Sequence, residues 1–420
     1  MSAAIQNKRK ILNDPVYGFI NIPDDIIFDL IEHPWFQRLR RIKQMGLSHL
    51  IYPGALHTRF HHSIGAMHLA NQTVQSLRFK GNIINDNELT GLCIAMLLHD
   101  LGHGPYSHNL ERVIIPAISH EKISLMGMES LNKQFHGKLN TGLNIYKNSY
   151  SKQWLSQLVS GQLDLDRLDY LCRDSFYTGV SEGVISVERI IKMLNIVDDN
   201  IVVEEKGIYS IEKFIVARRL MYWQVYLHKT VLAAETMLIN TIKRARFLMS
   251  QHVSLPCSPV FQLFLTHSYT QENFDNQPEL LEQFMTLDDV DVFAAIKQWQ
   301  SSHDTVLQLL SSSLTNRKLF RIIMRPEPFS PETIDYITAQ TMQEYNTSRE
   351  EAQFLITASE VVNNAFSPKS PQIRIIRKSG VVCNITDISE HLNQEMHTIG
   401  TVKHFLCFPK SVEIPKDYGL

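Results

Sequence analysis

The sequence is poor in cysteine and lacks the long apolar runs of membrane proteins. Its five cysteines are odd in number, scattered and without a CxxC pair. This argues against a disulfide framework or a zinc ribbon and predicts reduced, mostly buried thiols. No apolar run approaches the roughly 18 residues that a membrane span needs. The first ten residues, MSAAIQNKRK, lack the apolar segment of a secretory signal. We therefore expect a cytoplasmic protein that does not enter a membrane.

The chain also has no marked excess of charge of either sign. Its 41 basic and 43 acidic side chains leave a formal charge of -2. This balance argues against binding nucleic acid through bulk charge, although it leaves room for a local basic patch. We find no internal repeat and no low-complexity tract. At 420 residues, 44% of them hydrophobic, the chain has the composition of a globular protein of roughly two to three domains.

Apolar periodicity predicts a mainly α protein. Helical spacing recurs through the first three quarters of the chain, including long stretches at 214–248 and 280–310. A hairpin is expected at 201–210, with Lys206-Gly207 as its turn, and an irregular connection at 255–278. The other expected helices cover residues 26–31, 36–45, 64–77, 89–98, 123–131, 155–158 and 187–194.

The character of the sequence changes near Leu319. Strand-like patterns at 319–324, 372–377, 381–385 and 401–408 accompany a helix expected at 331–345, which has proline in its first turn. We therefore expect a helical domain over residues 1–318 and a small α+β lobe over residues 319–420.

Histidine is concentrated in one region of the chain. Of 18 histidines, eight lie between positions 57 and 120, where an even spread would place about three. They are His57, His61, His62, His68, His99, His103, His108 and His120. This region is where we expect the chemistry.

A metal site is the first chemistry that these residues indicate. At the end of an apolar helix, loosened by the glycines that follow, His99 and Asp100 can turn toward one point. An isolated His-Asp pair is often only a helix cap or a solvated pair. Here His62 can add a third ligand from another helix, and Asp166 heads an acidic helical stripe that can add a fourth. Mixed nitrogen and oxygen ligands suit a divalent metal.

These residues resemble the H…HD…D signature of the HD-domain phosphohydrolases. The surrounding motifs resemble the deoxynucleoside triphosphate triphosphohydrolase branch, whose human member joins a sterile-alpha-motif to an HD domain, and its bacterial relatives. The resemblance covers roughly residues 26–247 and only the catalytic core. The motifs are HTRFHHS at 57–63, HDLGHGPYSH at 99–108, His120-Glu121 and DLDRLDY at 164–170.

The resemblance implies an HD-domain helical core and one divalent metal ion (Zn, Fe, Mn, Ni or Mg) held by His62, His99, Asp100 and Asp166. It implies cleavage of a dNTP to deoxynucleoside and inorganic triphosphate, with a metal-activated water attacking the α-phosphate. His108 is then the acid for the leaving 5′ oxygen, and Glu111 orients it. The catalytic set expected from the resemblance is His103, His108, Glu111, His120 and Glu121. We interpret His61, His68 and His136, which match no family position, as core or helix-cap residues.

The substrate would be held by cations at its phosphates and by aromatic residues at its sugar. We expect Arg59, Arg218 and Lys229 on the phosphates, because guanidinium and ammonium groups bind phosphate oxygens. Asp174 would take the 3′ hydroxyl. The remaining substrate residues expected from the resemblance are Gln44, Arg167, Tyr170, Tyr226 and His228.

A basic run at 38–43 is either a solvated helix face or part of a regulatory site. By resemblance, Arg40 and Glu32 match positions that read an activating GTP or dNTP at a subunit interface. The resemblance therefore implies a homo-oligomer, a tetramer, with nucleotide-responsive activity.

Two other functions compete with this interpretation. One is an HD phosphohydrolase acting on another nucleotide, such as a monophosphate or a cyclic substrate, against which the set Tyr170, Asp174 and Tyr226 argues. The other is a nucleotide-sensing or nucleic-acid-binding module without turnover. The intact ligand set, together with His108 and Glu111, argues against lost turnover.

Overall fold

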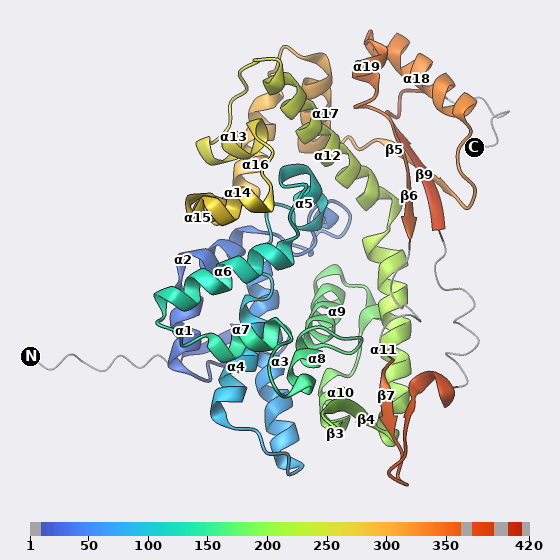
Figure 1. Cartoon of the computed structure of the whole chain (residues 1–420). Helices are drawn as coiled ribbons and strands as arrows, with labels where there is room; N and C mark the ends of the chain where they lie inside the picture. The colour runs from blue at the N-terminus through green and yellow to red at the C-terminus, as the bar shows by residue number, and fades with distance from the viewer. Residues whose placement is uncertain (1–9, 363–371, 390–401, 414–420) are drawn as a thin grey trace, which may run out of the picture.

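Helices build most of the molecule, as the computed structural model of the chain shows (Figure 1). The structure describes residues 10–362, 372–389 and 402–413. A small hairpin of β1 (Ile11–Asp14) and β2 (Gly18–Asn21) precedes the helices. Among the described residues, no helix combines the length and the hydrophobicity that crossing a bilayer requires.

The helices that surround the histidine-rich region form the centre of the fold. The helices α3 and α4 have buried residues on nearly every side, which shows that both lie inside the protein, surrounded by other helices. In contact with α3 are α4 and α9, and α4 also packs on α7. The helices up to α9 are α1 (Asp25–Glu32), α2 (Pro34–Gln37), α3 (Arg59–Phe79), α4 (Asp86–Leu98), α5 (His108–Ile114), α6 (His120–Gln134), α7 (Asn140–Tyr146), α8 (Gln153–Val159) and α9 (Leu165–Thr178).

The expected long helix at 214–248 is interrupted. It consists of α11 (Ile208–Met221), a π-helical turn at Tyr222–Tyr226, and α12 (Lys229–Ser250). The break has a local cause, since the His228 ring accepts a hydrogen bond from Thr230 N and caps α12. Single π turns within helices often occur at functional sites. The turn here brings Tyr222 and Tyr226 to the wall of a pocket described below.

The prediction of a hairpin at 201–210 is wrong. The strand β4 (Asn200–Glu204) exists, but its partner is the preceding β3 (Leu194–Val197), which follows α10 (Val187–Met193). The turn is Asp198-Asp199, whose φ angles of 48° and 57° suit a tight hairpin. Gly207 has φ of -90° and leads into α11 instead, so Lys206-Gly207 does not form the expected turn.

Two further expectations need correction. The helix expected at 36–45 ends early, because α2 passes into a 3₁₀ turn at Arg38–Arg41 and Ile42 is extended. The basic run therefore is not one solvated face, since the Arg38 side chain is fully buried. The connection at 255–278 also contains two helices, α13 (Pro259–Thr266) and α14 (Gln271–Asn276), each with a serine or threonine N-cap.

The C-terminal strands belong to two sheets. In the first, β5 (Arg321–Arg325) and β6 (Thr357–Val362) flank the central β9 (Val402–Phe408), and both pairings are antiparallel. In the second, β7 (Arg374–Ile376) pairs in parallel with β4, and β8 (Val382–Asn384) pairs antiparallel with β7. Strands from beyond residue 319 thus line the α11 and α12 side of the molecule (Figure 1). The division at residue 318 stays a prediction, and Thr401, expected in the last strand, lies outside the described residues.

Five further helices, α15 to α19, belong to the described part of the chain. The helix expected at 331–345 is confirmed as α18, with Ser330 as its N-cap and Pro331 at its first position. The others are α15 (Pro278–Phe284), α16 (Asp289–Trp299), α17 (Thr305–Thr315) and α19 (Arg349–Ala352). The mainly α fold with a C-terminal α+β part is confirmed.

Candidate active site

Four side chains from three helical segments converge at the centre of the helical region. His62 Nε2 lies 3.2 Å from His99 Nε2 and 3.1 Å from Asp166 Oδ1. Asp100 approaches His62 Nε2 to 3.5 Å through Oδ2 and His99 Nε2 to 3.4 Å through Oδ1. Atoms bound at about 2.0–2.2 Å to one ion lie about 3–3.5 Å apart. His62, His99 and Asp100 therefore have the mutual spacing that a single divalent ion requires, and Asp166 lies close to both histidines, 3.1 Å from His62 Nε2 and 3.7 Å from His99 Nε2.

Neighbouring groups orient both imidazole rings toward this point. His62 Nδ1 lies 2.8 Å from Asp169 Oδ2, and His99 Nδ1 lies 2.7 Å from the carbonyl oxygen of Met96. Each Nδ1 thus donates its proton outward, which leaves the Nε2 lone pair facing the cluster. Asp169 is in turn held by Arg173, whose Nε donates to Oδ2 at 2.9 Å. Two Nε2 atoms at 3.2 Å repel each other unless a proton or a metal cation lies between them.

The electrostatics of the cluster also favour a cation. Burial lowers the pKa of His62, but hydrogen bonds to Asp166 and Asp169 outweigh it and raise that pKa to about 10, so His62 Nε2 holds a proton that a metal ion would replace. Burial raises the pKa of Asp166, but His62 and His99 together lower it below its usual range. The carboxylates therefore stay ionised in a largely buried site, where a bound cation offsets their charge.

Two glycines allow the elements to approach closely enough. A Cβ atom at Gly65, one turn beyond His62 on α3, would lie 2.0 Å from Asp169 Oδ1. A Cβ atom at Gly102 would lie 2.3 Å from the carbonyl oxygen of His120 at the start of α6. The first glycine lets Asp169 reach His62, and the second brings His120 beside the loop that follows Asp100.

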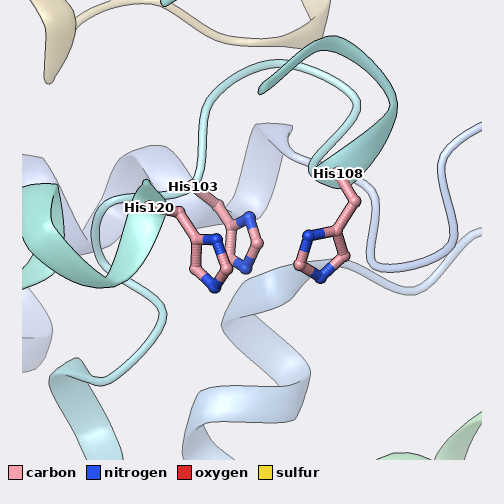
Figure 2. A group of neighbouring side chains, drawn as sticks. All are labelled: His103, His108 and His120. Atoms are coloured by element: carbon pink, nitrogen blue, oxygen red, sulfur yellow. The ribbon is translucent and has the colours of Figure 1, made fainter. Parts of the chain in front are cut away.

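Three further histidines form a second cluster beside the first (Figure 2). The rings of His103 and His120 stack with centroids 3.9 Å apart, and His108 stands edge-on to both. Glu111 joins two of them, because its carboxylate lies 3.2 Å from His108 Nδ1 and 3.0 Å from His120 Nδ1. Glu121 lies at the edge, with Oε1 3.4 Å from His120 Nε2.

His103 has an unusual environment within this cluster. It is 1% exposed, its Nε2 lies 3.3 Å from Asp100 Oδ1, and its Nδ1 has no hydrogen-bond partner among the described residues. Burial, and then the charge of Arg59, lower its pKa well below the usual range, so the ring is neutral at pH 7. The buried Nδ1 of this ring, which lacks a partner among the described residues, is available to bind a ligand.

One pocket, of about 440 Å³, connects both clusters. The predicted site residues that line it are Gln44, Arg59, Asp100, His103, His108, His120, Glu121, Asp166, Tyr170, Asp174 and Tyr226. Arg59 donates to Asp100 Oδ2 at 2.6 Å and to Ser107 Oγ at 3.0 Å, which places a buried guanidinium between the clusters.

A carboxylate and two tyrosines form another part of the pocket wall. Asp174 Oδ1 lies 2.7 Å from His57 Nε2, and Tyr226 Oη donates to Asp174 Oδ2 at 2.7 Å. The rings of Tyr170 and Tyr226 lie edge-to-face with centroids 6.3 Å apart. The carboxylate is thus held in one orientation beside two flat apolar surfaces.

Four of the expected substrate residues do not line this pocket. Arg167 bonds instead to Asp164 and to the carbonyl oxygen of Gly161. Arg218 is buried on α11, whereas Lys229 is exposed at the first position of α12 beside the capping His228. The predicted role of all four in substrate binding, with Arg218 and Lys229 at the phosphates, stays a prediction.

A structure with the same fold decides the family. A phosphohydrolase from Bacteroides thetaiotaomicron superposes with a TM-score of 0.93 and 49% sequence identity, and the match covers 96% of this chain and 100% of that one. The chain belongs to the HD-domain phosphohydrolases. Members of this family depend on metal ions, in agreement with the first cluster.

Other relatives of this HD-domain phosphohydrolase are more distant. The family described as HD associated region matches residues 185–254. The uncharacterized protein YwfO of Bacillus subtilis is 35% identical over 76% of this chain and 72% of that protein. The human deoxynucleoside triphosphate triphosphohydrolase SAMHD1 is 30% identical over 56% of this chain and 44% of the human protein. The chain thus spans less than half the length of that human relative.

Two residues that support or line the pocket of the phosphohydrolase were not expected from the sequence. His57 was counted in the histidine-rich region, but nothing in the sequence linked it to Asp174, which lies 117 positions away. Glu235 on α12 also lines the pocket. Burial raises the pKa of Glu235 to about 7, against the opposing effect of a hydrogen bond to Asn109. A carboxyl group among apolar helix residues carries no recognisable motif, which is why the sequence did not reveal it.

The pocket of the phosphohydrolase should therefore bind an anionic substrate less well as the pH rises through about 7. Below that pH Glu235 is neutral, whereas above it the carboxylate repels the substrate. A repulsion of about 1 kcal/mol corresponds to a roughly fivefold rise in KM. We expect Glu235→Gln to remove this part of the pH dependence of KM. Glu212→Gln, which changes a buried glutamate of α11 outside the pocket, should leave it intact. An unchanged KM profile in Glu235→Gln would contradict the assignment.

Proposed function

We propose that this HD-domain phosphohydrolase cleaves a dNTP to a deoxynucleoside and inorganic triphosphate. The observation that carries the proposal is that one pocket contains both a metal-ligating cluster and a carboxylate, Asp174, held between His57 and Tyr226. A metal-ligating cluster can bind a phosphate ester, and the Asp174 carboxylate can accept a hydrogen bond from a sugar hydroxyl. The similarity to human SAMHD1, named for the same activity, supports the assignment.

His62, His99, Asp100 and Asp166 are the residues that would hold the divalent ion. Their spacing, their outward Nδ1 donors and their ionised carboxylates fit such a group. When bound, the ion supplies a more acidic water and positive charge beside the phosphates. The outer partners Asp169 and Arg173 keep His62 in the orientation that ligation needs.

Proton transfer to the leaving group is the task we assign to His108. Water attacks the α-phosphorus, the bond from phosphorus to the 5′ oxygen breaks, and that oxygen must gain a proton to leave as a hydroxyl. His108 lines the pocket, and its Nδ1 is bonded to Glu111, which holds the ring and leaves Nε2 free to donate. Burial raises the pKa of Glu111, but hydrogen bonds to His108 and His120 outweigh it, so the carboxylate is ionised.

The phosphates would lie against Arg59, His103 and His120. Arg59 brings a permanent charge, and the neutral ring of His103 offers one N–H as a hydrogen-bond donor. Glu121 lies where it can position His120. Arg218 and Lys229 stay proposed phosphate ligands, and Arg167 and His228 stay proposed substrate contacts. All four need a side-chain movement to reach the pocket.

The sugar end of the pocket predicts discrimination against ribonucleotides. If Asp174 binds the 3′ hydroxyl while Tyr170 and Tyr226 cover C2′, a 2′ hydroxyl is buried without a partner. An unpaired buried hydroxyl costs about 1–3 kcal/mol, or roughly 5- to 150-fold in kcat/KM. We expect GTP to be a correspondingly poorer substrate than dGTP in parallel rate measurements. Equal kcat/KM values would refute the sugar pocket.

Product analysis tests the proposal directly. The purified protein is incubated with each of the four dNTPs and Mn²⁺, and the products are separated by anion exchange. We expect deoxynucleoside and triphosphate in equal amounts. Release of orthophosphate or pyrophosphate, or hydrolysis of nucleoside monophosphates or cyclic nucleotides alone, would assign the protein to another reaction of the family. Binding of nucleotide without any product would assign it to a sensing role.

We further propose a homo-oligomer, a tetramer, that responds to GTP or a dNTP through Arg40 and Glu32. The Arg40 guanidinium lies 3.5 Å from the centre of the Phe60 ring. Phe60 directly follows Arg59 in the sequence, and Arg59 lines the pocket, so a nucleotide bound at Arg40 could affect catalysis. Light scattering with and without GTP and a dNTP tests this: we expect a larger particle with nucleotide. A monomer under every condition would eliminate the oligomer.

A further inference from the structure

One carboxylate outside the pocket connects the two loops that form its walls. Asp289 begins α16 and is 4% exposed. Its Oδ2 accepts a hydrogen bond from Lys43 N at 2.9 Å, and its Oδ1 accepts one from Tyr106 N at 2.7 Å. The carboxylate therefore bridges backbone groups that are 63 residues apart in the sequence.

Both loops carry residues of the proposed site. Directly after Lys43 come Gln44 and Met45, which line the pocket, and Gln44 N donates to the carbonyl oxygen of His57 at 3.0 Å. The second loop, residues 103–108, runs from His103 to His108. Asp289 thus sets the distance between the wall that carries Gln44 and the wall that carries the catalytic histidines.

The second loop needs such support because its backbone is strained. Tyr106 and Ser107 have φ angles of 55° and 54°, which residues other than glycine rarely adopt. His108 follows at once and is the first residue of α5. The strained turn is held by Asp289 at Tyr106 N and by the Ser107 hydroxyl, which donates to the carbonyl oxygen of Lys43 at 3.1 Å. Losing these bonds would let the turn relax and carry His108 with it.

Arg38 makes a second connection between the same segments. Its fully buried guanidinium donates to the carbonyl oxygens of Leu101 at 2.7 Å and His103 at 2.9 Å. It also donates to the carbonyl oxygen of Leu287 at 2.8 Å, two residues before Asp289. The start of α16 is thus fastened to the catalytic loop from two sides.

The chemistry of a carboxylate suits this position. Only a side chain with two acceptor oxygens can receive both backbone donors, and asparagine would turn an NH₂ group toward one of them. Burial raises the pKa of Asp289 to about 6, although the hydrogen bonds from Lys43 N and Tyr106 N oppose that rise. The Asp289 carboxylate is thus kept in a buried place despite the free-energy cost of removing its charge from water, because there it accepts hydrogen bonds from two backbone N–H groups at once.

We propose that Asp289 is a positioning residue that clamps the two pocket loops and sets the place of His108. This role rests on the function proposed above, since it concerns the acid of that reaction. It lies outside the region of residues 26–247 where the sequence resembles the triphosphohydrolases.

The test compares Asp289→Asn with Asp288→Asn. Asp288 is the matched control because it is also 4% exposed, but its carboxylate bonds Arg41 and caps Val290 N. Asparagine is as good an N-cap as aspartate, so the control should keep its fold and its activity. Two readouts are taken on the full chain: hydrogen exchange of the peptide that contains Tyr106 and Ser107, and kcat and KM for dGTP.

For Asp289→Asn we expect at least tenfold faster exchange at Tyr106 and about tenfold lower kcat, with little change in KM and Tm. Exchange and kcat equal to those of Asp288→Asn would overturn the proposal, as would a loss of kcat that only follows a fall in Tm. If Asp289→Asn does not fold, Ser107→Ala removes the other bond to the first loop and should change both readouts in the same direction. Unchanged values in that variant would equally overturn it. Absence of dGTP hydrolysis in the unmodified protein would instead refute the proposed function, and the exchange measurement would still decide the clamp.

Discussion

Replacing Asp100 with asparagine, or His62 with alanine, is expected to abolish both metal binding and hydrolysis. His62→Ala removes a ligand atom and Asp100→Asn replaces an ionised ligand oxygen with a neutral amide, in a largely buried cluster whose histidine nitrogens lie 3.1–3.7 Å from its carboxylates. Mutation of a residue that only hydrogen-bonds to a metal ligand typically lowers metal affinity or activity roughly 10- to 100-fold. Changing a ligand itself should therefore lower both by more than about 100-fold. Elemental analysis of the purified variants, together with rates of triphosphate release, measures both effects.

A change at the same helix but outside the cluster provides the control. His68 also lies on α3 and is nearly as buried, but its ring packs against Tyr17. We expect His68→Gln to retain bound metal and most of the activity. Full metal occupancy in folded His62→Ala or Asp100→Asn would show that the ion, if any, is held elsewhere.

Replacing His108 with alanine should lower kcat by about 10²- to 10⁴-fold, the usual contribution of a general acid. KM and stability should change little, since the ring is 64% exposed and its hydrogen bond is to Glu111 alone. Glu111→Gln should have a smaller effect of the same kind, because it leaves the acid but loosens its orientation. His136→Ala, at the end of α6, is the matched control and should behave like the unmodified protein.

Substrates whose leaving groups differ in pKa distinguish a general acid from a residue with only a structural role. A phosphate ester with a leaving group of low pKa needs no proton to depart. With such an aryl ester, His108→Ala should lose much less activity than with dGTP. Equal losses on both substrates would contradict the role of His108 as the acid.

Local sequence patterns predicted the helices well and the strand pairings poorly. The limits of α18 follow from Ser330 and Pro331, both of which act within one turn. The hairpin was misplaced because Lys206-Gly207 resembles a turn, whereas the real turn uses Asp198-Asp199. The parallel pairing of Val203 with Ile375 joins segments more than 170 positions apart. Such pairings depend on tertiary packing that no local pattern encodes.

The candidate site was predicted where chemistry requires particular residue types. His62, His99, Asp100 and Asp166 could be selected because metal ligation restricts the choice to a few side chains. The supporting residues escaped notice for the opposite reason. An aspartate that accepts two backbone hydrogen bonds, as Asp289 does, has no distinguishing sequence context, and its partner Tyr106 lies 183 positions away.

The measurement that tests the central claim most directly is hydrolysis of dGTP in water enriched in ¹⁸O. If water attacks the α-phosphorus and the bond to the 5′ oxygen breaks, one labelled oxygen must appear in the released triphosphate and none in the deoxyguanosine. Mass spectrometry of the two products distinguishes the possibilities. We predict label in triphosphate alone. Label in deoxyguanosine, in pyrophosphate or in orthophosphate would contradict the proposed reaction.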